Sequence, residues 1–297
     1  MYSPEALRHL PDDRLYLPKI KLHSLEKFRA HNHNVQIFST AMKSRWPQRA
    51  YVGLYSGAGR AEVKETGEIV ETTAMSVFRL PDPFTHYVFV DKDPRCTEAL
   101  RERIKRLRGE GNLTVLTGDV NALRSDILKA LPRFSRTQGL LSYCFVDPFA
   151  ADLKFETIKF LGQLRMDFLI LLMLGLDARV NFRTYLMDES NTRIGDLVDC
   201  PHWRDEWRLE SRARRINVIH FLMKKFDEAM TRIGYKSAPP GDSLAVRVPH
   251  KSVLIYQLVL YSKHDLGRVF WDETRSGIAP QLPLFGGPPP HKGNSPA

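Results

Sequence analysis

Residues 51–59 read Tyr51-Val-Gly-Leu-Tyr-Ser-Gly-Ala-Gly59, and this stretch decides the fold. A short apolar run that ends in closely spaced glycines is typical of a buried strand whose backbone turns sharply beside a ligand. We therefore predict a strand over 51–55 and a ligand-facing turn directly after it. The G-x-G spacing is a weak signal by itself, because an ordinary tight turn gives the same pattern. The elements on either side help to decide between the two.

Short apolar runs alternate with amphipathic segments along most of the chain. Apolar runs of this kind are typical of strands buried on both faces, and the intervening helices indicate a parallel sheet covered on both sides. The further predicted strands are 85–90, 113–116, 140–146 and 168–174. The predicted helices are 24–45, 94–108, 120–131 and 155–165.

The pattern changes after residue 176. Residues 177–211 are charged and irregular, which predicts an insertion, and a long helix is expected over 212–234. Segments 244–248 and 253–261 predict a hairpin. A helix and a hairpin after five β/α units complete the sheet of class I S-adenosylmethionine (SAM)-dependent methyltransferases. We therefore expect that α/β, Rossmann-like fold, with a mostly parallel seven-stranded sheet and an antiparallel terminal strand. A nicotinamide dehydrogenase, which needs a full G-x-G-x-x-G, is disfavoured.

Length and composition indicate one large domain with short additions. The predicted parts are an N-terminal helical extension over 1–48, a methyltransferase-like domain over 49–275 and a disordered Pro/Gly-rich tail over 276–297. A net charge of +10 favours an anionic partner, above all nucleic acid, although charge can also serve solubility alone. Three widely spaced cysteines argue against a disulfide framework or a metal site. Neither a signal peptide nor an apolar span of ~20 residues is visible, so we expect a cytoplasmic protein.

Polar residues stand where the predicted strands end. Asp91, Asp119 and Asp147 each follow a strand, and the carboxyl ends of parallel strands meet in one crevice. We expect Asp91 to accept hydrogen bonds from a ribose and Asp119 to lie near an adenine; each aspartate could instead cap the helix that follows. The predicted SAM-binding residues are Tyr55, Ser56, Gly57, Gly59, Asp91 and Asp119.

Five segments between about residues 49 and 272 carry a family resemblance. They are residues 51–60, the Thr66-Gly67 spacer, Val88-Phe-Val-Asp-Lys-Asp93, Phe145-Val-Asp-Pro-Phe149 and Leu260-Tyr-Ser-Lys-His264. Their order and spacing resemble the three-Cys-motif partner (TcmP) proteins, a methyltransferase-like bacterial family. The resemblance implies SAM as the cofactor and a radical-SAM-like three-Cys-motif protein as a partner.

The chain departs from this family pattern at three places. The family's acidic residue on the first strand is Gly53 here, its Gly-Ser-Pro is Thr72-Thr73-Ala74, and the glycine after D-P-F is Ala150. The missing carboxylate at Gly53 removes an anchor for the methionine end of SAM. The resemblance therefore supports the fold more firmly than it supports catalysis.

Asp147-Pro148-Phe149 is similar to a shortened D-P-P-[FYW] motif of amino-group methyltransferases. In that motif a carboxylate and a prolyl carbonyl accept hydrogen bonds from the target amino group, and the aromatic ring stacks on the base. The resemblance therefore implies catalytic roles for Asp147, Pro148 and Phe149. The alternative is a turn at the sheet end with a buried phenylalanine. Lys263-His264, after the last strand, could face the same crevice or form a solvated strand end.

Residues 203–215 mix aromatic and basic side chains, as surfaces that stack bases and bind phosphates do. The alternative is packed tryptophans beside a solvated helix face. The predicted nucleic-acid-binding residues are Trp203, Arg208, Arg212, Arg214 and Arg215.

The tail carries a second candidate for partner binding. Gln281-Leu-Pro-Leu-Phe285 resembles the Q-L-x-L-F peptide that docks bacterial repair and replication proteins on the sliding clamp. The alternative is that its apolar side chains fold back onto the domain. The predicted clamp contacts are Gln281, Leu282, Leu284 and Phe285.

Two functions fit this sequence. The first is a SAM-dependent methyltransferase-like protein acting on or with nucleic acid, in a bacterial DNA-repair or phage-related setting. The second is a non-catalytic, degenerate methyltransferase domain that binds DNA or a repair protein. The aspartates at three strand ends favour the enzyme, whereas Gly53 favours the binding module.

Overall fold

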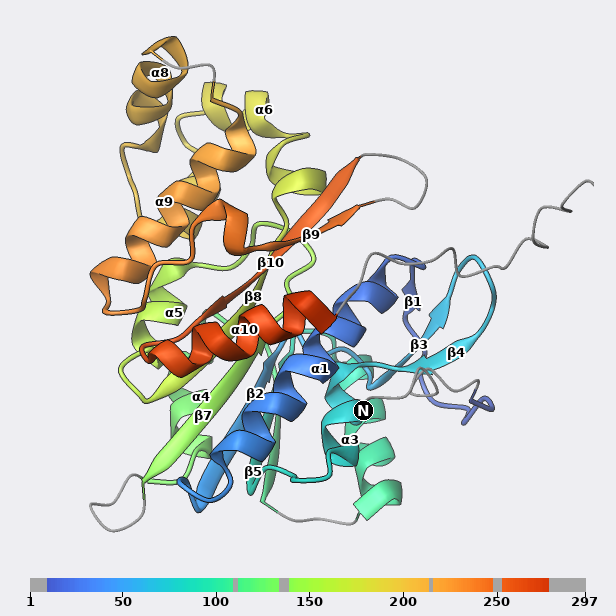
Figure 1. Ribbon diagram of the computed structural model, residues 1–297. Helices are drawn as coiled ribbons and strands as arrows, with labels where there is room; N and C mark the ends of the chain where they lie inside the picture. The colour runs from blue at the N-terminus through green and yellow to red at the C-terminus, as the bar shows by residue number, and fades with distance from the viewer. Residues whose placement is uncertain (1–9, 109–111, 134–138, 214–215, 248–252, 278–297) are drawn as a thin grey trace, which may run out of the picture.

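A seven-stranded sheet forms the centre of the molecule (Figure 1). The structure is a computed structural model that describes residues 10–108, 112–133, 139–213, 216–247 and 253–277. In spatial order the strands are β6 (Leu113–Thr117), β5 (His86–Asp91), β2 (Gln48–Leu54), β7 (Leu140–Val146), β8 (Met166–Leu172), β10 (Leu254–Tyr261) and β9 (Leu244–Arg247). Neighbouring strands are parallel except β10, which is antiparallel to both β8 and β9. The predicted fold class is confirmed, because the sheet is mostly parallel and its last strand runs against the others.

The strand order reverses beside β2. From β2 the chain adds β5 and β6 on one side, then crosses back to add β7 and β8 on the other. The loops that follow β2 and β7 therefore leave in opposite directions, and a crevice opens at the carboxyl ends of these strands. The glycine turn of residues 56–59 follows β2 directly, so it lies at this reversal.

Helices cover both faces of the sheet. On one face lie α1 (Ser24–Met42), α2 (Thr73–Ser76), α3 (Pro94–Arg108) and α10 (Asp265–Gly277); on the other lie α4 (Arg124–Ala130), α5 (Phe155–Leu161) and α9 (Val218–Arg232). Successive strand residues point to opposite faces, so Tyr51 packs with the α1 face and Val52 with the α9 face. Helices α1 and α10 lie next to each other across the near face in Figure 1.

Helix α1 is built into this core by polar and aromatic contacts. Its His31 is fully buried, and the Nε2 atom lies 2.8 Å from the Tyr51 hydroxyl on β2. Burial lowers the pKa of His31 to about 4, so the imidazole is neutral near pH 7. Asn34 accepts a hydrogen bond from the Tyr143 hydroxyl (2.8 Å) and donates one to Thr274 of α10 (2.9 Å). The helix that the sequence assigned to an N-terminal extension therefore shares its core with the sheet.

A small three-stranded sheet follows the glycine turn. It pairs β1 (Lys19–Ile20) with β3 (Arg60–Val63), and β3 with β4 (Ile69–Glu71). A 3-10 turn, η2 (Val77–Arg79), follows α2. These strands were not predicted, because strands of two to four residues carry too little periodicity to be recognised.

Residues 174–213 form a helical lobe at the top of Figure 1 instead of an irregular insertion. Its elements are a π-helical turn η3 (Leu174–Ala178), α6 (Phe182–Met187), α7 (Arg193–Val198) and α8 (Trp203–Ala213). The helix predicted over 212–234 is present as α9, but its predicted start is wrong, because α8 ends at Ala213 and α9 begins at Val218. Asn217 starts the second helix: its side chain accepts the backbone N–H of His220 at 2.9 Å.

The C-terminal part follows the prediction more closely. A 3-10 turn, η4 (Pro240–Asp242), precedes the predicted hairpin, whose strands β9 and β10 pair antiparallel. Helix α10 was not predicted, although Leu266 and Phe270 stand four residues apart on its inner side. Helices α4 and α5 are shorter than predicted.

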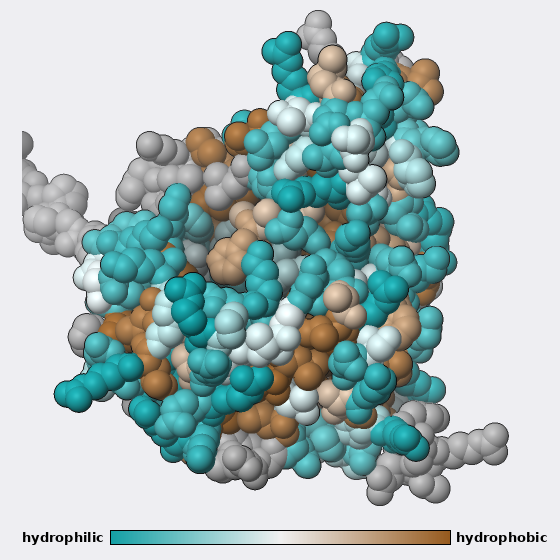
Figure 2. All heavy atoms as spheres, turned by 180° about the vertical axis from the view of Figure 1, so that it is seen from behind, coloured by the Kyte–Doolittle hydropathy of each residue, from teal (hydrophilic) through white to brown (hydrophobic). Residues whose placement is uncertain are grey.

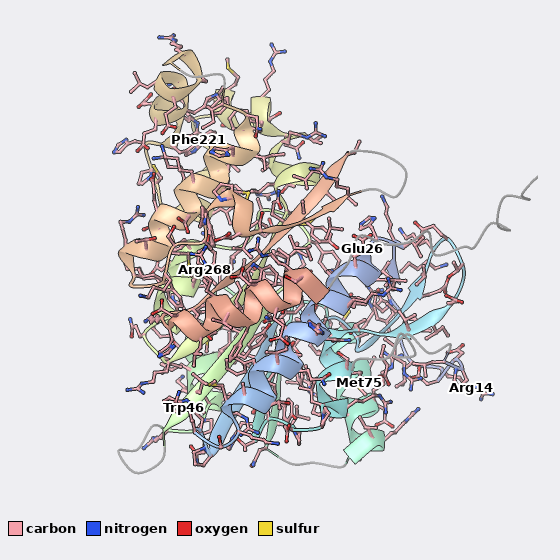
Figure 3. All side chains as sticks on the ribbon, viewed as in Figure 1. Arg14, Glu26, Trp46, Met75, Phe221 and Arg268 are labelled. Carbon is pink, nitrogen blue, oxygen red and sulfur yellow. The ribbon has the colours of Figure 1, made fainter. Side chains whose placement is uncertain are left out.

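Hydrophilic side chains cover most of the face seen in Figure 2, with apolar groups exposed between them. Figure 3 places Phe221 of α9 in the upper part of the molecule and Trp46, which follows α1, at the lower end. Within the ranges given above, no helix is long and apolar enough to cross a lipid bilayer.

Candidate functional site

The glycine turn after β2 has a backbone that few residues tolerate. Tyr55, Gly57 and Gly59 all have positive φ, at 62°, 65° and 84°. A Cβ at residue 59 would lie 2.8 Å from both Leu100 Cδ1 and Met75 Cγ, so only glycine fits there. At Gly57 no atom lies within 4 Å of such a Cβ, which leaves open space above the turn. The predicted ligand-facing turn is therefore open on one side and tightly packed on the other.

Asp91, at the end of β5, lies under this turn. One carboxylate oxygen accepts the backbone N–H of Gly57 at 2.8 Å, and the other accepts the N–H of Asp93 at 2.9 Å. The residue is only 6% exposed. Each oxygen still has a lone pair free for a further donor. Asp91 thus ties the turn after β2 to the end of β5.

The crevice contains two cavities, and we call the one beside β6 the outer cavity. It has a volume of about 580 Å³ and is bordered by Lys92, Gly118, Asp119 and the lobe residue Arg193. Asp119 is exposed, and its carboxylate accepts the backbone N–H of Asn121 at 2.7 Å. This aspartate therefore has a local turn-forming role as well as a place at the cavity.

Asn121 joins the walls of the outer cavity and was not among the predicted site residues. Its side-chain oxygen accepts the backbone N–H of Lys154 (3.0 Å) and the hydroxyl of Thr157 (2.9 Å). Its amide group donates to the carbonyl of Asp152 at 3.0 Å. No sequence signal marks these contacts, because they join residues more than 30 positions apart.

The second cavity, which we call the inner cavity, has a volume of about 260 Å³. Residues of α1, β1, the glycine turn and Asp147-Pro148-Phe149 line it. Pro148 is buried, whereas the Phe149 side chain is 75% exposed. The alternative of a sheet-end turn with a buried phenylalanine is therefore wrong. Tyr55 lines both cavities, so they adjoin at this residue.

Lys27 reaches the inner cavity from the first turns of α1. Its Nζ atom lies 2.7 Å from both carboxylate oxygens of Asp147, and each side chain is 14% exposed. Thr72 also lines this cavity, and its hydroxyl is buried without a hydrogen-bond partner. Neither Lys27 nor Thr72 was predicted as a site residue. Lys27 stands 120 positions from Asp147, so no local motif could reveal the pair.

Neighbouring side chains also leave little room for a carboxylate at Gly53. A Cβ at this position would lie 2.9 Å from Phe89 Cδ1 and 2.9 Å from Ser56 Oγ. The Ser56 hydroxyl donates to the carbonyl of Gly53 at 2.7 Å, which holds it in this place. An acidic side chain would therefore require both neighbours to move.

The prediction that residues 203–215 bind nucleic acid needs a correction at Trp203. Trp203 is fully buried and packs against Phe182, with ring centroids 5.7 Å apart, so its ring has no free face for a base. Arg208 is ion-paired with Asp205 at 2.9 Å, and Arg212 is exposed. Arg214 and Arg215 lie outside the described residues, as do the predicted clamp contacts Gln281, Leu282, Leu284 and Phe285.

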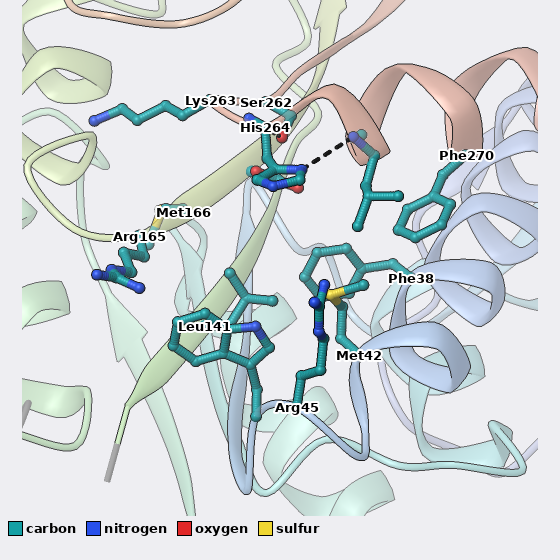
Figure 4. A pocket seen from close by; sticks show the side chains of 14 residues that line it. Phe38, Met42, Arg45, Leu141, Arg165, Met166, Ser262, Lys263, His264 and Phe270 are labelled. Atoms are coloured by element: carbon teal, nitrogen blue, oxygen red, sulfur yellow. Dashed lines mark hydrogen bonds between the residues drawn. The ribbon is translucent and has the colours of Figure 1, made fainter. Parts of the chain in front are cut away.

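Lys263 and His264 lie at the opposite end of the sheet from the crevice. Because β10 is antiparallel, its last residue is near the amino ends of β7 and β8. Both side chains border a cavity of about 650 Å³, which we call the amino-end cavity (Figure 4). Lys263 donates to the carbonyl of Gly162 at 2.6 Å. The alternative that these residues face the same crevice as Asp147 is therefore wrong.

Within the described ranges, no group of three or more His, Cys, Asp or Glu side chains is arranged to hold a metal ion. No protein-family profile matches the chain, and no curated protein matches it. Solved structures do match, at low identity. The chain is similar to a magnesium protoporphyrin IX methyltransferase from Synechocystis with bound SAM, at 8% identity over 86% of this chain and 88% of that one, with a TM-score of 0.42.

Two further structural matches concern methyltransferases or their ligands. The methyltransferase domain of bacterial CtHen1 matches at 12% identity over 78% of this chain and 99% of that one, with a TM-score of 0.36. The N-terminal domain of EvdMO1 with SAH bound matches at 11% identity with a TM-score of 0.29. There the chain spans about half of its counterpart, 46% of this chain against 48% of that one. The order and directions of the strands carry the fold assignment.

Proposed function

We propose that this protein binds SAM in the crevice at the carboxyl ends of the strands and transfers a methyl group to an amino group of nucleic acid. One observation carries the proposal. The glycine turn, held by Asp91, and Asp147-Pro148-Phe149 meet at the wall of one crevice. The parallel pairing of β2 with β7 brings these two motifs together from distant parts of the chain.

The residues of the crevice fit this cofactor. Asp91 has acceptor capacity left for the two hydroxyls of a ribose. The outer cavity, bordered by Lys92 and Asp119, would hold the nucleoside end. The inner cavity would hold the amino-acid end, where the unpartnered hydroxyl of Thr72 can form a hydrogen bond. Tyr55 would contact the middle of the molecule, since it lines both cavities.

SAM supplies a methyl group that is already activated, so the protein's main task is to hold the target in line with it. In this proposal Asp147 and the carbonyl of Pro148 accept hydrogen bonds from the target amino group. The exposed ring of Phe149 offers a face on which a base can stack. A base in a single strand, or one turned out of a duplex, could reach this position.

Nucleic acid as the substrate is supported by charge. The chain carries a net charge of +10, and the exposed lysines Lys21 and Lys64 stand on the rim of the inner cavity, which Phe149 also lines. Basic side chains beside an aromatic ring suit a phosphate backbone with stacked bases. Arg212, exposed on α8, is a further basic side chain available to an anionic partner.

A non-catalytic function is the second candidate, and two observations favour it. Gly53 leaves no room for a first-strand carboxylate. Lys27 contacts both oxygens of Asp147, so the ion pair already uses part of the acceptor capacity that a target amino group would need. On this view the domain binds DNA or a repair protein without methyl transfer.

Calorimetric titration with SAM and its demethylated product S-adenosylhomocysteine (SAH), followed by a transfer assay, tests the proposal. Labelled methyl groups would be offered to single-stranded and duplex DNA and to RNA. We expect SAM to bind and Asp147→Ala to abolish transfer to the preferred nucleic acid. Binding without transfer to any of these substrates would support the non-catalytic function. No measurable binding at millimolar SAM would overturn the enzyme proposal.

We further propose, from the family resemblance alone, that a radical-SAM-like three-Cys-motif protein is a partner of this chain. The two proteins would be produced together, and an affinity tag on this chain should recover the partner. Recovery of the tagged chain alone under these conditions would argue against the partnership.

Sliding-clamp docking through Gln281, Leu282, Leu284 and Phe285 is proposed from the tail sequence. Two apolar side chains and an aromatic ring in a short peptide suit a preformed apolar pocket, and Pro283 limits the entropy lost on binding. Titration against the clamp of the source organism should detect binding by the wild type and not by Leu284→Ala/Phe285→Ala. Equal binding of both proteins, or none, would exclude this role.

A further inference from the structure

The ion pair between Lys27 and Asp147 is enclosed by the wall of the inner cavity. Both oxygens of Asp147 lie 2.7 Å from the lysine nitrogen, and both side chains are mostly buried. Removing two charges from water costs much of what their attraction contributes, so such a pair is a weak source of stability. Both residues line the cavity, so each charged group can form an ion pair or hydrogen bond with a ligand in place of its present partner.

The charges that face the inner cavity come from elements other than β2. Gly53 supplies no charge, and a side chain at this position would require Phe89 and Ser56 to move. The amino-acid end of SAM carries one carboxylate and one ammonium group. Lys27 on α1 has the charge that complements the carboxylate, and Thr72, which lines the same cavity, has an unpartnered hydroxyl.

The position of Tyr55 decides which end of the cofactor meets Lys27. This residue lines both cavities, so the two adjoin at Tyr55. The strand ends at Lys92 and Asp119 line the outer cavity, and Asp91 precedes Lys92 directly, so the nucleoside is assigned to the outer side. The amino-acid end is then directed to the inner cavity, where Lys27 lies.

We infer that Lys27 binds the α-carboxylate of the cofactor and releases Asp147 when it does so. This inference rests on the proposed function and adds a residue and an order of events to it. With Lys27 engaged by the cofactor, the oxygens of Asp147 become available to a target amino group. Lys27 exchanges one ion pair for another, whereas Asp147 gives up its lysine and accepts hydrogen bonds from the target amino group instead. It also makes cofactor binding precede productive substrate binding.

Calorimetry with three ligands tests this role without measuring activity. SAH has the whole amino-acid end, decarboxylated SAH lacks the carboxylate, and 5′-methylthioadenosine lacks the amino-acid end. We expect the wild type to bind SAH roughly 10-fold or more tightly than decarboxylated SAH, the scale of a charge-assisted hydrogen bond. In Lys27→Met the two should bind equally, and 5′-methylthioadenosine should bind as it does to the wild type.

Lys21→Met is the matched control, because Lys21 is an exposed lysine on the rim of the same cavity. It should leave the preference for SAH over decarboxylated SAH unchanged. An equal loss of this preference in both variants would overturn the inference in favour of general electrostatic attraction. Equal binding of SAH and decarboxylated SAH by the wild type would overturn it without depending on any variant. If SAH does not bind the wild type at all, the proposed function itself fails.

Discussion

The two ends of the central sheet differ in what their loops contribute. At the carboxyl ends lie cavities of about 580 and 260 Å³; Asp147 and Lys27 line the smaller one, and Asp91 holds the glycine turn beside it. At the amino ends lies the larger cavity, about 650 Å³, with apolar walls that include Phe38 and Phe270 (Figure 4). The larger cavity is not the one that the glycine turn and the strand-end aspartates face. Strand direction therefore identifies the candidate site better than cavity size does.

The amino-end cavity has the features of a packing junction. Helix α10 starts there so close to the end of β10 that a Cβ on Gly267 would lie 2.2 Å from the Cβ of Ser262. Asp167 lies beneath this contact, and burial raises its pKa to about 7. In Figure 4 the Arg165 and Lys263 side chains lie to the left, apart from Phe38, Met42 and Phe270. The comparison predicts that substitutions at the crevice affect ligand binding, whereas those at the amino end affect stability.

The largest change is expected in the free energy of unfolding of the Gly59→Ala variant. The new Cβ would clash with Leu100 and Met75, and the residue would keep a φ of +84°. Strain and overpacking together should lower the free energy of unfolding by about 3 kcal/mol, measured by urea denaturation. The matched control is Gly57→Ala, which has a φ of +65° but open space, and should cost only about 1 kcal/mol. Equal destabilisation by the two substitutions would show that Leu100 and Met75 do not confine residue 59.

A smaller effect is expected from Asp91→Ala. Loss of the carboxylate removes the acceptor for the Gly57 N–H and the proposed contact to the ribose. SAM binding should weaken by about 1–3 kcal/mol, the scale of removing a hydrogen-bonding group. The control at the other end is Asp167→Ala, which should leave the dissociation constant unchanged. If both substitutions weakened SAM binding to a similar extent, the assignment of ligand binding to the carboxyl ends of the strands and of stability to the amino ends would be wrong.

Asp167→Asn should change stability in a pH-dependent way. The folded-state pKa of Asp167, about 7, is above the usual value near 4, because burial disfavours the charged form. The folded protein therefore holds this proton more tightly than the unfolded chain, and stability falls as the pH rises from about 4 to 7. The amide cannot ionise, so the variant should match the wild type near pH 4 and melt a few degrees higher near pH 8. A Tm difference that does not depend on pH would contradict this explanation.

The smallest effect is expected on nucleic-acid binding. Neutralising Arg212, Arg214 and Arg215 should reduce the magnitude of the log–log salt slope for duplex DNA by roughly 0.9 for each phosphate that the protein no longer neutralises. The control is Arg45→Ala/Arg165→Ala at the amino end, which should leave the slope as it is. An unchanged slope in the triple variant would place the binding surface elsewhere, with the basic helix α3 as the next candidate.

Much of the central sheet could be predicted from the sequence. The bounds of α3 and β7 agree with the prediction, and β2, β5, β6 and β8 differ by a few residues at their ends. These elements are buried on one or both faces, so their apolar pattern is local and continuous. The two motifs that follow β2 and β7 were recognised for the same reason, since a strand end and its turn are adjacent in the chain.

The contacts that only the tertiary structure decided join residues that are far apart in the chain. Lys27 meets Asp147 across 120 positions, and Asn121 joins loops more than 30 positions away. Trp203 stands beside arginines in the sequence but is buried, because α8 turns it toward Phe182. The sequence by itself determined which strands form and where their polar ends stand, since those follow from short-range hydrophobic patterns. The partners of each charged side chain were decided by packing, because their contacts join elements that no local pattern connects.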